Sequence, residues 1–174
     1  MYIWDLNLRL FHWFLVLFMI LSIISGKMNY LFFHQFFGSI CLGLICFRIY
    51  WGFFGTYHSI FKNFFYTPKE IILFLKGDYL NKKIKTAHNP LGSLSVISFY
   101  FLIIVLSLSG LFSSDDILFD GPLTFISPNN TPFFTKTHNF FHYLIYALIL
   151  LHILAVLYYQ FIKKESLINQ MIDG

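Results

Sequence analysis

The segment "THNFFHYLIYALILLHILAVLYY", residues 137–159, carries three histidines but no acidic residue, lysine or arginine. It is long enough to cross the hydrocarbon core of a bilayer, which takes about twenty apolar residues at a rise of 1.5 Å each. Ionisable side chains are costly in a bilayer, and those that occur there usually face the interior of a helix bundle. The segment therefore predicts a membrane-spanning helix whose imidazoles have a function.

Apolar runs of similar length recur along the chain, in which 57% of the 174 residues are hydrophobic and 11% are charged. They predict four spans, at residues 6–25, 31–53, 91–112 and 132–162. The runs are continuously apolar, unlike the shorter, alternating strands of a membrane β-barrel. The first run is too long for a cleavable signal peptide and lacks a clear small-residue cleavage site. We predict an all-α membrane protein in which residues 1–174 form one four-transmembrane-helix bundle.

The distribution of cations predicts the orientation of the bundle. With four spans, both termini and the loop between the second and third spans lie on one side of the membrane. That side carries ten of the twelve lysines and arginines, and the other side carries only Lys27 and Lys136. Because cytoplasmic segments are enriched in these residues, we expect both termini to be cytoplasmic. The ten cations are Arg9, Arg48, Lys62, Lys69, Lys76, Lys82, Lys83, Lys85, Lys163 and Lys164.

Helix-start signals occur outside the spans. In "TPKEIILFLKG" (residues 67–77), Thr67 is expected to cap a short helix, Glu70 to complete a capping box and Gly77 to end the helix. Its apolar residues favour packing on the bilayer surface over docking of a partner. Thr131 is expected to cap the fourth spanning helix.

The spacing of the histidines indicates two tiers. Fourteen residues separate His138 from His152, which places them on the same face of a helix to within roughly 40° and about 21 Å apart along its axis. His12 lies near the cytoplasmic start of an outward helix and His152 lies in the cytoplasmic half of an inward one, so they share a depth. By the same argument His34 pairs with His138 on the periplasmic side. His142 is turned away from His152 by about 80°.

Two imidazoles that face each other at one depth are typical axial ligands of a six-coordinate haem iron, so two such tiers predict a bundle that encloses two haems. The chain has no C-x-x-C-H motif, so any haem would be bound non-covalently. Cys41 and Cys46 are five residues apart and face different sides of a helix. A lone membrane histidine is as often a packing residue, but four in a depth-matched pattern favour haem ligation.

Several stretches resemble one family in the same order. They are "WDLNLRLFHWF" from Trp4, "RIYWGFFGTYHSIF" from Arg48, "AHNPLGSLSVISFYFLIIVLSLSGLF" from Ala87 and "DDILFDGPL" from Asp115. Together they are similar to the bacterial cytochrome b561 family, which includes the b-type cytochrome subunits of nickel-iron hydrogenases. The resemblance covers essentially the whole chain.

The resemblance implies four helices that hold two haem b groups through His12, His34, His138 and His152. The chain departs from the family pattern in three places. Asn7 replaces a usual proline and Ala87 a usual glycine. The third departure is an extra imidazole, His142, which is an alternative ligand to His138.

Arg48 and His88, together with His58, fall near the cytoplasmic helix ends, where they would suit contacts to haem propionates or to a quinone headgroup. An equally weighted interpretation is that the segment around His88 begins a helix, with Asn89 near the cap and Pro90 in the first turn.

The function expected from these features is electron transfer across the bacterial inner membrane, between a periplasmic redox protein and the quinone pool. The partner would be a cytochrome c or a hydrogenase-like enzyme, and the chain would serve as the membrane subunit of a respiratory oxidoreductase. No nucleic-acid partner is expected. Asp115, Asp116 and Asp120 could attract a basic partner, although a solvated loop is favoured. The alternatives are a metal-ion transporter, which would need ligands clustered at one depth, and a membrane anchor without haem.

Overall fold

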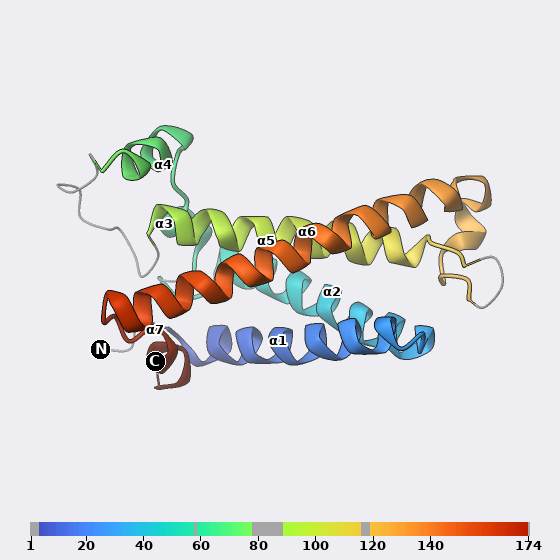
Figure 1. Ribbon diagram of the computed structural model, residues 1–174, viewed down its shortest axis with the longest axis horizontal. Helices are drawn as coiled ribbons and strands as arrows, with labels where there is room; N and C mark the ends of the chain where they lie inside the picture. The colour runs from blue at the N-terminus through green and yellow to red at the C-terminus, as the bar shows by residue number, and fades with distance from the viewer. Residues whose placement is uncertain (1–3, 58, 78–88, 116–118, 174) are drawn as a thin grey trace.

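The computed structural model describes residues 4–57, 59–77, 89–115 and 119–173. Four long helices dominate it: α1 (Leu6–Lys27), α2 (Leu31–Phe54), α5 (Pro90–Leu111) and α6 (Thr131–Leu157). Figure 1 shows them running back and forth along the long axis of the molecule. All four are long and apolar enough to cross a membrane. The chain is a multi-pass, all-helical membrane protein.

Each long helix begins and ends within two residues of a predicted span, if the π-helical turn η3 (Tyr158–Ile162) is counted with α6. The shorter elements lie between the spans or after them: α3 (Phe61–Phe64), α4 (Pro68–Leu75), the 3₁₀ turns η1 (Thr124–Ile126) and η2 (Pro128–Asn130), and α7 (Leu167–Asp173). Within the described ranges the only β pairing is one isolated bridge, between Ser114 and Asp120.

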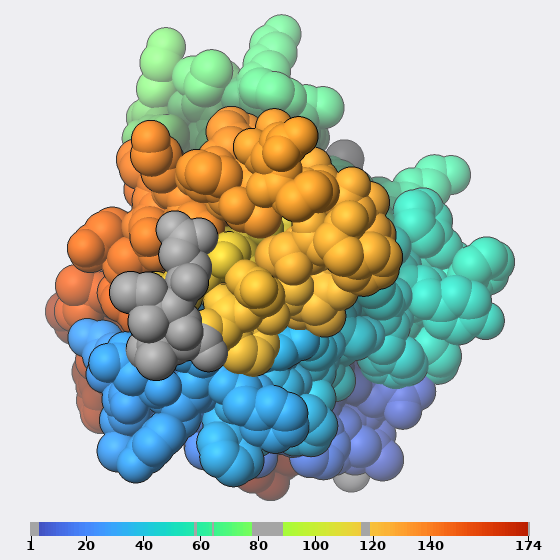
Figure 2. Space-filling view, turned by 90° about the vertical axis from the view of Figure 1, so that its right-hand side faces the viewer, coloured from blue at the N-terminus to red at the C-terminus, as the bar shows by residue number. Residues whose placement is uncertain are grey.

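The two ends of the bundle differ. Both termini, α3 and α4 lie at one end, and the α1–α2 turn and the α5–α6 connection lie at the other (Figure 1). Figure 2 views the second end, where the segment from η1 to the start of α6 lies beside the α1–α2 turn. The described cations in the first turn of α1, in the second half of α2, in α3 and α4 and after η3 therefore lie toward the end that carries the termini.

The helix-start predictions are confirmed at α4. The backbone N–H of Glu70 donates to Thr67 Oγ1 at 3.3 Å, and the backbone N–H of Thr67 donates to Glu70 Oε2 at 2.8 Å, which together form a capping box. The helix gives way to a turn at Gly77, whose φ of +79° suits a residue without a side chain. At α5 the helix-start interpretation of this segment is confirmed, because Asn89 Oδ1 accepts from the backbone N–H of Gly92 at 2.7 Å.

The prediction for Thr131 is wrong. This residue is already the first helical residue of α6, and the preceding Asn130 makes no side-chain capping bond. The Thr131 hydroxyl instead donates to the carbonyl of Pro128 at 3.2 Å. The 3₁₀ turn η2 runs directly into α6 and takes the place of a capping residue.

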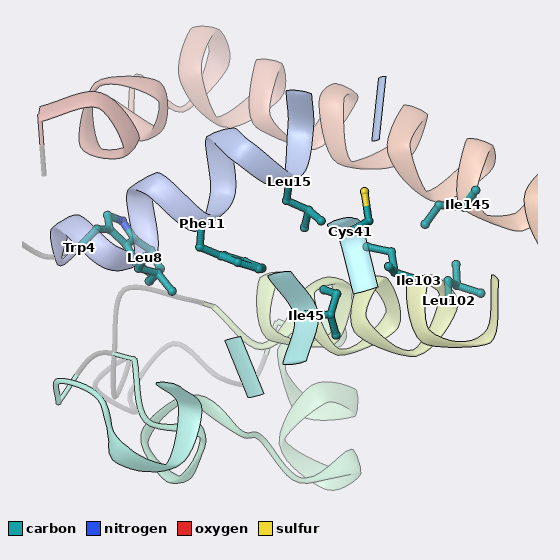
Figure 3. Close-up of a cluster of buried hydrophobic side chains, with 9 residues drawn as sticks. All are labelled: Trp4, Leu8, Phe11, Leu15, Cys41, Ile45, Leu102, Ile103 and Ile145. Carbon is teal, nitrogen blue, oxygen red and sulfur yellow. The ribbon is translucent and has the colours of Figure 1, made fainter. Parts of the chain in front are cut away.

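The long helices pack in the order α1 on α2, α2 on α5 and α5 on α6. Figure 3 shows a thin line of buried apolar side chains between them. Ile45 at its centre is fully buried, whereas outward side chains such as Phe32 are 68% exposed, as suits a lipid-facing surface. Cys41 is buried and Cys46 exposed, so they face different sides of α2 as predicted. The cluster comprises Trp4, Leu8, Phe11, Leu15, Cys41, Ile45, Leu102, Ile103 and Ile145.

Asp5 ties the start of α1 to the end of α2 and to the loop that follows. Its Oδ1 accepts from the backbone N–H of Leu8 at 2.8 Å, which makes it the N-cap of α1. Its Oδ2 accepts from the hydroxyls of Thr56 and Ser59 and from the indole N–H of Trp51 at 3.4 Å. One carboxylate therefore serves two helices.

The same contacts set the charge state of this carboxyl group. Burial acts to raise the pKa of Asp5, but hydrogen bonds from Ser59, Thr56, Leu8 and Trp51 outweigh it, so the pKa lies below its ordinary value. A carboxyl group whose pKa is lowered on folding contributes stability above its unfolded pKa of about 3.9, and the contribution is lost as the pH falls through the folded value.

We therefore expect Asp5→Ala to destabilise the protein at pH 7 by at least the roughly 1 kcal/mol of a lost helix cap. The difference from the wild-type chain should shrink as the pH is lowered below about 4. Thermal unfolding in detergent at several pH values measures it. Asp173→Ala, at an exposed position in α7, is the control. A difference that stays constant with pH would contradict the role given to the ionised carboxylate.

Candidate functional site

His34 and His138 face each other at the end of the bundle opposite the termini. His34 lies in the first turn of α2 and His138 near the start of α6. Their ring centroids are 5.9 Å apart and their planes are perpendicular, at 90°. The sequence spacing placed these two residues at one depth, and the structure brings them together.

A main-chain carbonyl holds each of these two rings. His34 Nδ1 lies 2.8 Å from the carbonyl oxygen of Ser22 in α1, and His138 Nδ1 lies 2.9 Å from that of Leu106 in α5. A carbonyl oxygen only accepts, so Nδ1 carries the proton in both rings. The lone pair of each neutral ring is then on Nε2, which is the state in which imidazole binds a metal.

Glycine makes room for both contacts. The first span ends in "SIISG" (residues 22–26) and the third in "LSLSG" (residues 106–110), and in each the accepting carbonyl lies four residues before the glycine. A Cβ on Gly26 would lie 2.8 Å from His34 Nδ1, and one on Gly110 would lie 3.2 Å from His138 Nδ1. Each imidazole therefore packs on a bare stretch of the neighbouring helix.

Both rings line a cavity of about 720 Å³ between the helices. This volume lies within the range of roughly 300–1,000 Å³ that is typical of cofactor sites. Two charged side chains of opposite sign, Lys27 and Asp115, also line it. The Lys27 ammonium sits 5.5 Å from the ring centroid of Tyr146, another lining residue.

The facing pair fits a haem iron held by two imidazoles. If both Nε2 atoms bound one metal, two metal–nitrogen bonds of about 2 Å and roughly 1 Å from each nitrogen to its ring centre would give about 6 Å between centroids. The observed 5.9 Å matches this sum. Among the described residues, no group of three or more histidine, cysteine, aspartate or glutamate side chains gathers to hold a metal ion.

His142 lines the same cavity but is arranged differently. Its ring centroid lies 3.8 Å from that of Tyr143 and 5.4 Å from that of Tyr146. Its neighbour one turn earlier, His138, is the one that faces His34. The geometry thus favours His138 over His142 as the partner of His34.

The second predicted pair is His12 in α1 and His152 in α6. Both side chains are half-buried. The ring of His152 contacts Phe99 edge-on at 5.5 Å, and that of His12 contacts Trp13 at 5.2 Å. His12 Nδ1 is buried, and no residue that the structure describes forms a hydrogen bond with it.

Arg48 is 2% exposed and lies in the second half of α2, toward the end of the bundle that carries the termini. Its Nη2 donates to the carbonyl of Ser59 at 3.0 Å, and its guanidinium lies over the rings of Phe61 at 5.1 Å and Tyr100 at 5.8 Å. Ser59, whose carbonyl accepts this bond from Arg48, also donates its hydroxyl to Asp5. His58 and His88, the other residues expected here, lie outside the described residues.

Several contributors were not identified from the sequence. The carbonyls of Ser22 and Leu106 and the glycines beside them belong to this group, and the repeated Ser-Gly ending of two spans is the signal that could have found them. The C-terminal helix α7 is another. Its carbonyls at Met171 and Ile172 accept from Trp13 Nε1 at 3.0 Å and from Arg9 Nη1 at 2.5 Å, which places α7 against α1 near His12.

The family model for prokaryotic cytochrome b561 matches residues 3–174. The matched range includes all four long helices and all seven histidines. No curated protein and no solved structure matches the chain.

Proposed function

This chain belongs to the prokaryotic cytochrome b561 family of membrane electron-transfer proteins, and on that premise we propose that it carries electrons across the bacterial inner membrane through two non-covalent b haems. The facing of His34 and His138, each with Nδ1 on a main-chain carbonyl, is the observation that carries the proposal. The 5.9 Å between the two ring centroids suits an iron that binds both imidazoles. Because Nδ1 carries the proton in each ring, both Nε2 atoms are available to bind that iron.

In this proposal His34 and His138 hold one haem, and His12 and His152 hold the other. Haem supplies a one-electron couple, and the chain supplies ligands, orientation and an environment that excludes water. The carbonyls of Ser22 and Leu106 fix the two ring orientations. Arg48 and His88 are the proposed contacts to propionates or to a quinone headgroup.

The spacing along α6 suits transfer between the two tiers. Fourteen residues of helix put His138 and His152 about 21 Å apart along the axis. The edges of two macrocycles would be closer than their centres, so an electron could pass directly between the tiers. The bundle thus spans most of the roughly 30 Å hydrocarbon core with two redox sites.

The orientation and the partners are part of the proposal. The cation-rich end would be cytoplasmic, which puts the His34–His138 tier on the periplasmic side. A periplasmic cytochrome c or hydrogenase-like enzyme would exchange electrons there, and a quinone would do so from the membrane. Asp120 is bonded to Ser114 Oγ at 2.5 Å, which supports the simpler role of the acidic segment as part of the surface loop.

The haem content of the purified chain tests this function. We expect two low-spin b haems per chain, measured by the pyridine haemochrome assay and by the reduced-minus-oxidised visible spectrum. The reason is that each of two tiers offers two imidazoles. A chain purified without haem would contradict the proposal, and zinc binding by that haem-free chain would then separate the transporter from the anchor.

A further inference from the structure

One lysine reaches across the wall of the cavity that holds His34 and His138. Lys27 is the last residue of α1 and directly follows Gly26, which packs against His34. Its ammonium lies 5.5 Å from the ring centroid of Tyr146 in α6, within the distance of a cation–π contact. Since Lys27 and Tyr146 both line the cavity, this contact places a positive charge on the wall between α1 and α6.

The charge of Lys27 has no acidic partner among the residues that the structure describes. Lys136, the other lysine predicted for this side of the membrane, does not line the cavity. Asp115, which follows α5, lines it and carries the opposite charge. In a cavity of low dielectric a cation stabilises a nearby anion and an acidic side chain repels it. The wall around Lys27 is therefore suited to an anion.

We propose that Lys27 binds a propionate carboxylate of the haem at the His34–His138 tier and thereby sets the direction in which the carboxylate edge of that haem points. The inference rests on the proposed function. Two facing imidazoles fix the centre of a haem but leave it free to rotate about the axis through the two Nε2 atoms, so a further contact has to select the rotation.

The cost of burying a carboxylate explains why that contact would be a cation. A carboxylate at the edge of the hydrocarbon core is costly unless it is paired with a positive charge. Lys27 supplies this charge from α1, and the ring of Tyr146 holds the ammonium toward α6. A rotation that brought a carboxylate to Asp115 would be opposed by repulsion.

The dimethyl ester of haem b tests this contact, because it keeps the iron and the macrocycle but has no carboxylate. Haem b and the ester are titrated separately into the full chain carrying His152→Ala, in which only the His34–His138 tier keeps both imidazoles. We expect haem b to bind about fivefold more tightly than the ester, which is the upper end of what an exposed ion pair contributes. Adding Lys27→Gln should abolish this preference, whereas Lys27→Arg, which keeps the charge, should retain it.

Lys136→Gln is the matched control, since it removes an exposed cation that does not line the cavity, and it should retain the fivefold preference. Equal affinity of the Lys27 chain for haem b and its ester would overturn the inference although haem is bound. So would a preference for haem b that survives Lys27→Gln, or a loss in that variant that is the same for both compounds. Failure of the chain with all its histidines to bind either compound would instead overturn the proposed function.

Discussion

Replacing His138 with alanine is expected to remove one of the two proposed haems and to leave the other spectroscopically intact. His138 faces His34 at 5.9 Å between ring centroids, and its Nδ1 is held by the carbonyl of Leu106. Without it a haem iron in that tier would have only His34 as an imidazole ligand. The haem-to-chain ratio should therefore fall from two to about one.

His142→Ala is the matched control for this change. It removes an imidazole from the same helix, one turn away and lining the same cavity, but not one that faces His34. The variant should keep both haems. Imidazole added to His138→Ala should restore the lost spectrum by filling the vacated position. Loss of haem from His142→Ala together with retention in His138→Ala would reassign the ligand.

Most of the fold could be predicted because each span satisfies a local requirement. About twenty apolar residues are needed wherever a helix crosses a bilayer, so the ends of the four long helices follow from the sequence alone. The cap of α4 also depends only on neighbours, Thr67 and Glu70. The cap of α6 was predicted wrongly because η2 supplies a start that depends on the shape of the preceding loop.

The candidate site was predictable in part. Helical periodicity and chain direction gave the pairs, since depth depends only on residue number and helix rise. The acceptors for the imidazoles could not be found in this way, because they are main-chain carbonyls that every residue carries. Only the packing of α1 against α2 and of α5 against α6 selects those of Ser22 and Leu106. The Asp5 contacts likewise join segments about fifty residues apart.

These contacts make each helix hairpin a unit. In the first hairpin α1 supplies the carbonyl and the glycine that receive the imidazole of α2. In the second hairpin α5 does the same for α6. The facing tier thus joins two hairpins, each of which fixes the orientation of its own imidazole. A small change in the helix of each hairpin that carries neither His34 nor His138 should therefore disturb the site.

Gly26→Ala is such a change, and we expect it to weaken haem binding at the His34–His138 tier by 10–100-fold, as is typical when an outer-shell partner of a metal ligand is lost. The new methyl group would lie 2.8 Å from His34 Nδ1, so the imidazole must turn away from the carbonyl of Ser22. Gly110→Ala meets His138 at 3.2 Å and should have a smaller effect of the same kind.

Gly43→Ala distinguishes this steric effect from a general effect of alanine. A Cβ at Gly43, in the middle of α2, would meet nothing within 4 Å, and alanine favours a helix over glycine by roughly 0.5–1 kcal/mol. Haem titration of the three variants in detergent should therefore rank them Gly26→Ala weakest, Gly110→Ala intermediate and Gly43→Ala equal to the wild-type chain. If Gly26→Ala bound haem with wild-type affinity, His34 would not need its contact with the Ser22 carbonyl in order to bind. That contact would then contribute only to the packing of α2 against α1.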